Sequence, residues 1–179
     1  KAVEAGADAL IAVCGGAGGH CGTINPFALV NEIREVTDKP IILSGGMSTG
    51  RDIYAAQAMG ATYAYMGTRF IACEETLANE RYAQTLIACT SKDIFFSAAL
   101  DGAPANWVVP TLLEAGVDLN KLATTIPGEI VDSGKVDKRY SHVLSAGHGV
   151  GMVKKVESAL DLCAQLKSEY QHAKTALSA

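Results

Sequence analysis

The sequence predicts an α/β fold built from repeated β-α units. Short apolar runs alternate with helical stretches through the first 70 residues, and these runs are too continuously apolar for strands that expose one face to water. Most of the glycines lie in the same part of the chain, where they mark turns between the units. Three such units are compatible with a (β/α) barrel and with a doubly wound sheet.

The first strand is predicted at residues 9–14, which are all apolar. Gly6 precedes it and ends a helical stretch, because glycine readily adopts the left-handed conformation found after helices. The first complete helix is predicted to begin after Asn25-Pro26, since asparagine is a favourable N-cap and proline fits the first helical turn. Its apolar residues recur on one face: Leu29, Val30, Ile33 and Val36.

The second and third units repeat this order. A strand is predicted at residues 41–44, a helix at about residues 51–59 and a third strand at residues 63–66. Gly60 ends the helix between them, as Gly6 does before the first strand. All three strands are therefore expected to be parallel and buried, with helices on the outside.

The pattern changes after Glu74. Helical stretches at residues 77–88 and 110–115 alternate with loops, and no further buried strand is expected. We therefore divide the chain into β-α units at residues 1–74, a mainly helical insertion at residues 75–145, and a loop with a long closing helix at residues 146–179. The apolar residues of the closing helix share one predicted stripe: Val153, Val156, Leu160, Cys163, Leu166, Tyr170 and Leu177.

The composition indicates a globular protein, with 49% hydrophobic and 19% charged residues and a formal net charge of −4. This apolar content excludes a disordered chain, and the acidic balance argues against a nucleic-acid surface. No apolar run is long enough to span a membrane and the first eight residues lack the core of a signal peptide, so a cytoplasmic location is predicted. The five cysteines form no CxxC pair, and neither a disulfide framework nor a zinc site is predicted.

A glycine-rich loop with a histidine follows the first predicted strand. Residues 15–20 end in His20, and side chains at the carboxyl ends of parallel strands point into the usual site of such folds. A tight loop with a surface imidazole is the alternative interpretation. Cys21, beside His20, is either a small buried hydrophobe or a reactive thiol whose pKa the imidazole lowers. His148, in a second glycine-rich loop, faces either the site or the solvent.

A second candidate site lies at the ends of the next two strands, at Ser44-Gly45-Gly46 and Met66-Gly67-Thr68. Two adjacent strand ends with free backbone N–H groups are typical of the phosphate sites of barrels, and a phosphorylated ligand is therefore predicted. The alternative is that the glycines only relieve crowding. Arg69 follows directly and either adds charge at the phosphate or pairs with Glu74 or Glu75.

The residues around these strand ends read AVCGGAGGHCGTINPFALV, PIILSGGMSTGRDIYAAQAMGA and YMGTRFIACEE. They resemble the nitronate monooxygenase family, formerly called 2-nitropropane dioxygenases, and LDGAPANWVVPTLLEAG and SAGHGVG are similar to further segments of that family. The resemblance implies the C-terminal part of an FMN-binding (β/α)8 TIM barrel with a helical insertion that forms a substrate subdomain. On that mapping the first half of the barrel lies outside this chain, which begins with Lys and is expected to be part of a longer protein.

The resemblance also implies roles for individual residues. His20 matches the catalytic histidine, which acts as a base or as an electrostatic partner for an anionic substrate. Gly18 and Gly46 match glycines that contact the flavin, with Gly45 as a neighbour. The residues that match the phosphate segment are Tyr65, Met66, Gly67 and Thr68.

The implied activity is the FMN-dependent oxidation of alkyl nitronates by dioxygen to carbonyl compounds and nitrite. The implied partners are a small-molecule nitronate or nitroalkane, dioxygen and a second copy of the chain in a homo-oligomer, without nucleic acid or membrane. One alternative is an FMN-dependent NAD(P)H reductase that acts on enoyl-acyl carrier protein or a quinone. Another is a non-catalytic fragment, because three strands cannot close a barrel, and the isolated chain is then expected to be inactive.

Overall fold

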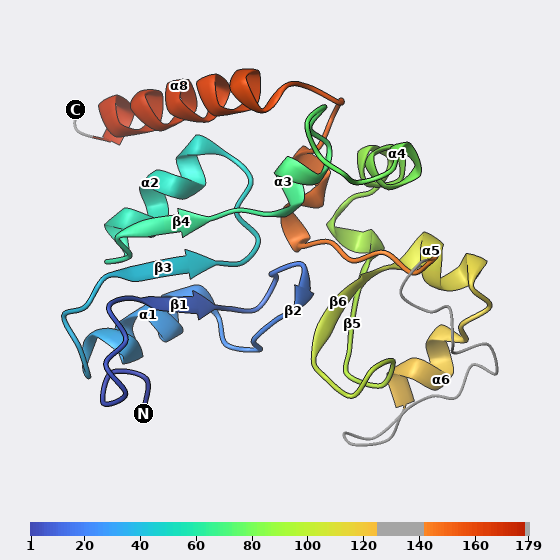
Figure 1. Cartoon of the computed structure of the whole chain (residues 1–179), viewed down its shortest axis with the longest axis horizontal. Helices are drawn as coiled ribbons and strands as arrows, with labels where there is room; N and C mark the ends of the chain where they lie inside the picture. The colour runs from blue at the N-terminus through green and yellow to red at the C-terminus, as the bar shows by residue number, and fades with distance from the viewer. Residues whose placement is uncertain (125–141, 178–179) are drawn as a thin grey trace.

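The computed structural model describes residues 1–124 and 142–177, and its N-terminal part is built on a parallel sheet (Figure 1). Strands β1 (Leu10–Val13), β3 (Ile41–Ser44) and β4 (Tyr63–Tyr65) lie side by side in chain order. The three predicted strands and their parallel direction are confirmed. Within the described residues they form an open sheet with β1 and β4 at its edges.

Helices α1 (Pro26–Arg34) and α2 (Gly50–Ala58) connect these strands as predicted. The Asn25 side chain accepts the N–H of Phe27 at 3.0 Å, which confirms the predicted N-cap. A capping box that the sequence analysis missed begins α2. There, Thr49 Oγ1 accepts the N–H of Asp52, and the Asp52 carboxylate accepts the N–H of Thr49.

Both helices pack on the same face of the sheet. Strands and helices contribute to one buried cluster there: Ala12, Val30, Ile41, Leu43 and Ala56. On the opposite face, Ile11 remains 57% exposed and Tyr63 remains 61% exposed. The prediction of strands buried on both faces is therefore only half right, because α1 and α2 cover a single face.

A second sheet overturns the prediction that no buried strand follows residue 74. Strands β5 (Ile94–Ser97) and β6 (Ala105–Val108) pair antiparallel, and every residue of β6 is buried. The other edge of β6 pairs with the short strand β2 (Gly19–His20). A search for apolar runs misses β6 because Asn106 stands within it, where its side-chain amide donates to the carbonyl of Ala17 at 2.7 Å.

Helices α4 (Glu80–Ala88) and α5 (Val109–Glu114) occupy the two helical stretches predicted for the insertion. Helices α3 (Thr68–Ile71) and α6 (Leu119–Thr124) and the 3-10 turn η1 (Ser91–Asp93) accompany them. Residues 125–141 of the predicted insertion lie outside the described residues. The division of the chain into three parts stays a prediction, and the pairing of β2 with β6 joins the first part to the second.

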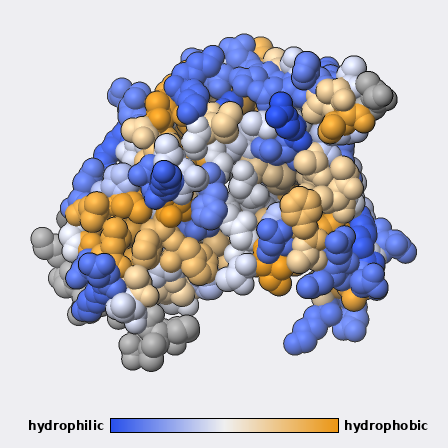
Figure 2. Space-filling view, turned by 180° about the vertical axis from the view of Figure 1, so that it is seen from behind, coloured by the Kyte–Doolittle hydropathy of each residue, from blue (hydrophilic) through white to orange (hydrophobic). Residues whose placement is uncertain are grey.

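The C-terminal part consists of the 3-10 segment η3 (His148–Met152) and the helix α8 (Ala159–Leu177), which packs across α2 (Figure 1). The predicted stripe is right only at Leu166, which is buried, and Tyr170, which contacts α2. Val153 and Val156 precede the helix, and Leu160 and Leu177 are exposed. The buried residues of α8 are Leu162, Leu166 and Ala173. Figure 2 shows hydrophilic residues along the edge where the outer face of α8 lies. In residues 1–124 and 142–177, no helix has the length and apolar character needed to cross a bilayer.

Close contact between α2 and α8 depends on Gly50. A Cβ atom at this position would lie 2.1 Å from the carbonyl oxygen of Leu166 and 2.4 Å from the backbone nitrogen of Tyr170. The N–H of Gly50 also donates to Glu169 Oε2 at 2.7 Å. The two helices can therefore approach this closely only where α2 carries no side chain.

The substitution Gly50→Ala is expected to lower the free energy of unfolding by about 1–3 kcal/mol, because both atoms in the way belong to the backbone and α8 must shift. Urea-induced unfolding of the full-length protein measures this change. The matched control is Gly15→Ala, whose Cβ would meet its nearest atoms at 3.5 Å, an ordinary contact. Equal stability of the two variants would contradict the proposed role of Gly50.

Candidate functional site

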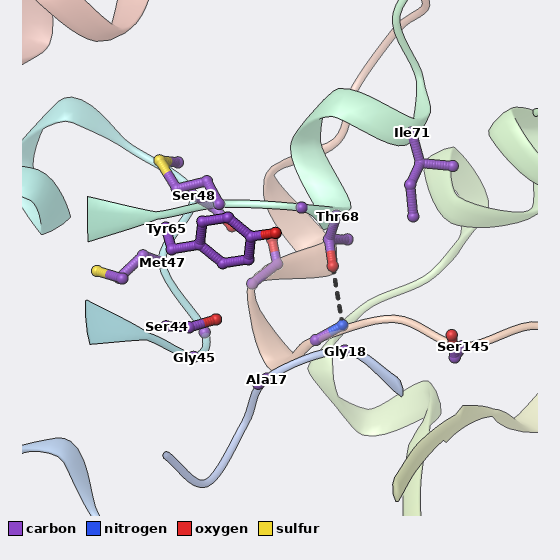
Figure 3. Close-up of a pocket in the computed structure, with 15 residues that line it drawn as sticks. Ala17, Gly18, Ser44, Gly45, Met47, Ser48, Tyr65, Thr68, Ile71 and Ser145 are labelled. Carbon is purple, nitrogen blue, oxygen red and sulfur yellow. Dashed lines mark hydrogen bonds between the residues drawn. The ribbon is translucent and has the colours of Figure 1, made fainter. Parts of the chain in front are cut away.

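The loops that follow β1, β3 and β4 meet at one pocket (Figure 3). Gly18 comes from the loop after β1, Gly45 and Gly46 from the loop after β3, and residues 65–68 from the end of β4 and the start of α3. The structure therefore brings together all seven residues that the sequence analysis assigned to cofactor binding. Parallel strands explain this, because their carboxyl ends lie at the same edge of the sheet.

The glycines of this pocket have different physical roles. A Cβ at Gly45 would lie 2.3 Å from Cys14 Sγ, so this glycine relieves crowding. A Cβ at Gly46 would meet no atom closer than 4.0 Å and one at Gly67 none within 4 Å, so these two glycines leave space open. Gly46 also has a φ of 69°, which favours glycine. Of the three strand-end glycines Gly45, Gly46 and Gly67, crowding therefore requires glycine only at Gly45.

Residues 147–149 complete the pocket and were predicted only as a loop. The N–H of Gly147 donates to Thr68 Oγ1 at 3.0 Å, and the N–H of His148 donates to the carbonyl of Gly16 at 2.9 Å. Ser48 Oγ donates to the carbonyl of Gly149 at 2.9 Å. This segment is thus bonded to all three strand-end loops. The alternation of glycines at positions 147, 149 and 151 is a sequence signal that could have indicated such close packing.

Glycine is required where this segment meets the other loops. A Cβ at Gly149 would lie 2.0 Å from Ser48 Oγ and 2.5 Å from the carbonyl oxygen of Gly46. A Cβ at Gly147 would lie 2.7 Å from the carbonyl oxygen of Gly16. The shape of the pocket therefore depends on backbone contacts between segments that are far apart in the chain.

The donors around the pocket are neutral. Among the described residues that line it there is neither Lys nor Arg, whereas hydroxyl groups come from three serines, Tyr65 and Thr68. Among the hydrogen bonds of the described residues, none is donated by the backbone N–H of Gly45, Gly46 or Gly67. Figure 3 shows the ring of Tyr65 between Met47 and Thr68 among the residues that line the pocket. Neutral N–H and O–H donors of this kind can bind an anionic group such as a phosphate.

His20 lies in β2 and is not part of the pocket lining. Its backbone pairs with Ala105 of β6, and its side chain is 65% exposed. The Nε2 atom lies 2.8 Å from Oδ2 of Asp101, a residue whose own side chain is only 6% exposed. The imidazole is thus exposed but held by a buried carboxylate, a contact that sequence reasoning did not foresee because Asp101 is 81 positions away.

Residues 1–169 match the family model described as nitronate monooxygenase. The chain belongs to the nitronate monooxygenase family. It is 35% identical over 123 residues to a nitronate monooxygenase of Paraburkholderia phytofirmans, a match that covers 64% of this chain and 34% of that protein. The resemblance expected from the strand-end motifs is therefore confirmed.

Two solved structures are similar to this member of the nitronate monooxygenase family over 98% of its length. FabK from Thermotoga maritima is 25% identical with a TM-score of 0.81, and the chain covers 58% of it. A nitroalkane oxidase from Streptomyces ansochromogenes is 28% identical with a TM-score of 0.78, and the chain covers 55% of it. The chain thus spans little more than half the length of these proteins, and about a third of the Paraburkholderia relative is matched.

Arg69 has a structural role in this family member. Its guanidinium is 5% exposed, donates to the carbonyl of Met152, and lies 3.3 Å from Glu157 Oε1. Both expectations for this residue are therefore wrong, because it neither lines the pocket nor pairs with Glu74 or Glu75. The partner was not foreseen because Glu157 is 88 positions away in the chain.

The thiol of Cys21 is partly buried beside β6. Burial raises the pKa of its thiol, and the side-chain amide of Asn106 donates to its sulfur at 3.3 Å. A raised pKa leaves less thiolate at neutral pH, which makes a thiol less reactive. The structure therefore favours the interpretation of Cys21 as a packed residue. His148 is exposed and lines a second cavity next to Gly16 and Asn106.

Proposed function

We propose that this chain supplies the phosphate-binding end of the flavin site and the histidine loop of an FMN-dependent nitronate monooxygenase. The observation that carries the proposal is the convergence of three parallel strand ends on one pocket. This pocket is lined by hydroxyls and by backbone N–H groups that make no hydrogen bond within the described part of the chain. Membership of the nitronate monooxygenase family supports it. The proposed reaction is the oxidation of an alkyl nitronate by dioxygen to a carbonyl compound and nitrite.

The residues of the pocket fit the phosphate end of FMN. Gly46 and Gly67 leave room where any other residue would place a Cβ, and their N–H groups are free to donate. Thr68 Oγ1 accepts from Gly147 and keeps its own proton for a ligand. The cavity measures about 190 Å³, less than the roughly 300–1,000 Å³ of pockets that enclose a whole ligand. It therefore suits one end of the cofactor.

The redox chemistry would come from bound FMN, which accepts electrons from the substrate and transfers them to dioxygen. The residues of this chain would bind the cofactor and orient the substrate. Gly45, Gly46 and Gly67 would donate to the phosphate, and Tyr65 would shield it from water. Neutral His20 would remove a proton from the carbon next to a nitro group, whereas protonated His20 would pair with a nitronate.

Anaerobic flavin absorbance of the full-length protein tests the proposal. The protein is titrated separately with ethyl nitronate and with NADH or NADPH. Bleaching of the flavin by the nitronate alone is the expected result. Bleaching by the nicotinamide alone would overturn the proposal and favour the NAD(P)H reductase.

A further inference from the structure

We propose that Asp101 is a positioning residue that holds His20 in one tautomer, with Nε2 protonated and Nδ1 directed to the substrate. This inference rests on the proposed function, in which His20 is the catalytic residue. The observation behind it is the 2.8 Å contact between His20 Nε2 and Asp101 Oδ2. The proposal gives a function to the segment between β5 and β6, which is not part of the proposed flavin site.

The two partners of this contact have very different surroundings. The Asp101 side chain is 6% exposed, whereas that of His20 is 65% exposed. The second carboxylate oxygen of Asp101 accepts the N–H of Ala103 at 3.1 Å, which fixes the carboxylate in the turn between β5 and β6. A buried, fixed acceptor that faces an exposed ring will orient the ring, and not the reverse.

The backbone around His20 is held by the same sheet. Gly19 pairs with Asn106 and His20 with Ala105, and the N–H of Cys21 donates to the carbonyl of Pro104 at 2.9 Å. The β5–β6 hairpin therefore fixes both the main chain and the side chain of the histidine. Without the hairpin, residues 19–21 would be an unsupported glycine-rich loop.

The chemistry of the contact decides the tautomer. A carboxylate offers only acceptors, so the imidazole nitrogen that faces it must carry the proton. In neutral His20 this leaves the lone pair on Nδ1, because the hydrogen bond made by one ring nitrogen determines the role of the other. Among the described residues, no hydrogen bond involves Nδ1 of His20. Nδ1 is therefore the atom that takes the proton from a nitroalkane or, once protonated, donates to a nitronate.

Long-range ¹H–¹⁵N spectra of the imidazole rings in the full-length protein test this tautomer directly. The His20 signals are assigned by their loss in His20→Asn. The expected result is a protonated Nε2 and an unprotonated Nδ1 in the wild type, and a mixture of tautomers in Asp101→Asn, whose amide can donate to Nε2 as well as accept from it. A wild-type ring protonated on Nδ1 would overturn the inference. This spectrum does not depend on nitronate oxidation. The inferred tautomer can therefore be disproved while the proposed function stands, and the proposed function can be disproved while the tautomer stands.

Kinetics with nitroethane, from which neutral His20 would remove a proton, provide the second readout. Asp101→Asn is expected to lower kcat roughly tenfold to a hundredfold with a smaller change in KM. This loss is smaller than the roughly 10²–10⁴-fold contribution of a positioned acid or base, because the imidazole itself is retained. In the His20→Asn background the same substitution should change kcat no further. The matched control is Asp118→Asn, an exposed aspartate at the start of α6 that accepts the N–H of Asn120 and has no histidine partner among the described residues. Equal activity of Asp101→Asn and Asp118→Asn would overturn the inference.

Discussion

Replacing Arg69 by alanine is expected to lower the free energy of unfolding by about 3–5 kcal/mol, because the change removes one partner of a buried ion pair. Arg69 and Glu157 are 5% and 10% exposed, and the same guanidinium donates to the carbonyl of Met152. These contacts attach α3 to the segment that leads into α8. Lys155 lies 3.3 Å from the other carboxylate oxygen of Glu157, so the loss should fall at the lower end of that range. Urea-induced unfolding of the full-length protein measures it.

The chain offers a matched control for this substitution. Arg81 pairs with Glu114 at the surface, where the two side chains are 43% and 63% exposed, and exposed pairs contribute only about 0–1 kcal/mol. Arg81→Ala should therefore be nearly neutral. Arg69→Lys, which keeps the charge but not both contacts, should fall between the two alanine variants. A loss in Arg69→Ala no greater than that in Arg81→Ala would contradict a structural role for Arg69.

Gly149→Ala is expected to weaken FMN binding by about tenfold to a hundredfold, because overpacking of about 1–3 kcal/mol must be relieved by moving the pocket wall. The new Cβ would lie 2.0 Å from Ser48 Oγ and 2.5 Å from the carbonyl oxygen of Gly46. The serine side chain can rotate, but the carbonyl belongs to the backbone of the proposed phosphate loop. The dissociation constant of FMN, measured by the quenching of its fluorescence, reports the change.

Gly151→Ala controls for the loss of a glycine in the same segment. Its Cβ would meet no atom closer than Cα of Thr90, at 3.8 Å, and FMN affinity should be unchanged. Ser48→Gly combined with Gly149→Ala removes the contact with the side chain and leaves the contact with Gly46. This double variant should recover only part of the affinity. Full affinity in Gly149→Ala would contradict the role of residues 147–149 as a wall of the flavin site.

The β-α units were predictable because their signals are local. Asn25-Pro26 begins α1 through a hydrogen bond to the N–H of Phe27, two residues away. Gly60 follows α2 with a φ of 105°, as the sequence analysis expected of a residue that ends a helix. The same locality made the candidate pocket predictable. Once three parallel strands are recognised, the residues after each strand must lie at one edge of the sheet.

The missed elements depend on partners that are distant in the chain. The strand β6 escaped because Asn106 is polar, and the carbonyl that accepts from its amide belongs to Ala17, 89 positions earlier. The buried face of α8 was misjudged because it depends on where α8 meets α2, at Gly50 and Leu166. In both cases the local sequence gives no sign of the role of the residue. Asn106 fits a buried strand, and Gly50 a helix contact, only because of a partner that is distant in the chain.

The sequence by itself determined the parallel β-α units, the family and the strand-end residues of the pocket, because short-range capping, apolar runs and strand direction depend on neighbours in the chain. Only the tertiary structure decided that residues 147–149 close the pocket, that Arg69 pairs with Glu157 and that Asp101 faces His20. Each of these contacts joins residues that are 79 or more positions apart. Their formation depends on how the elements pack in space, and the spacing of residues along the chain does not encode it.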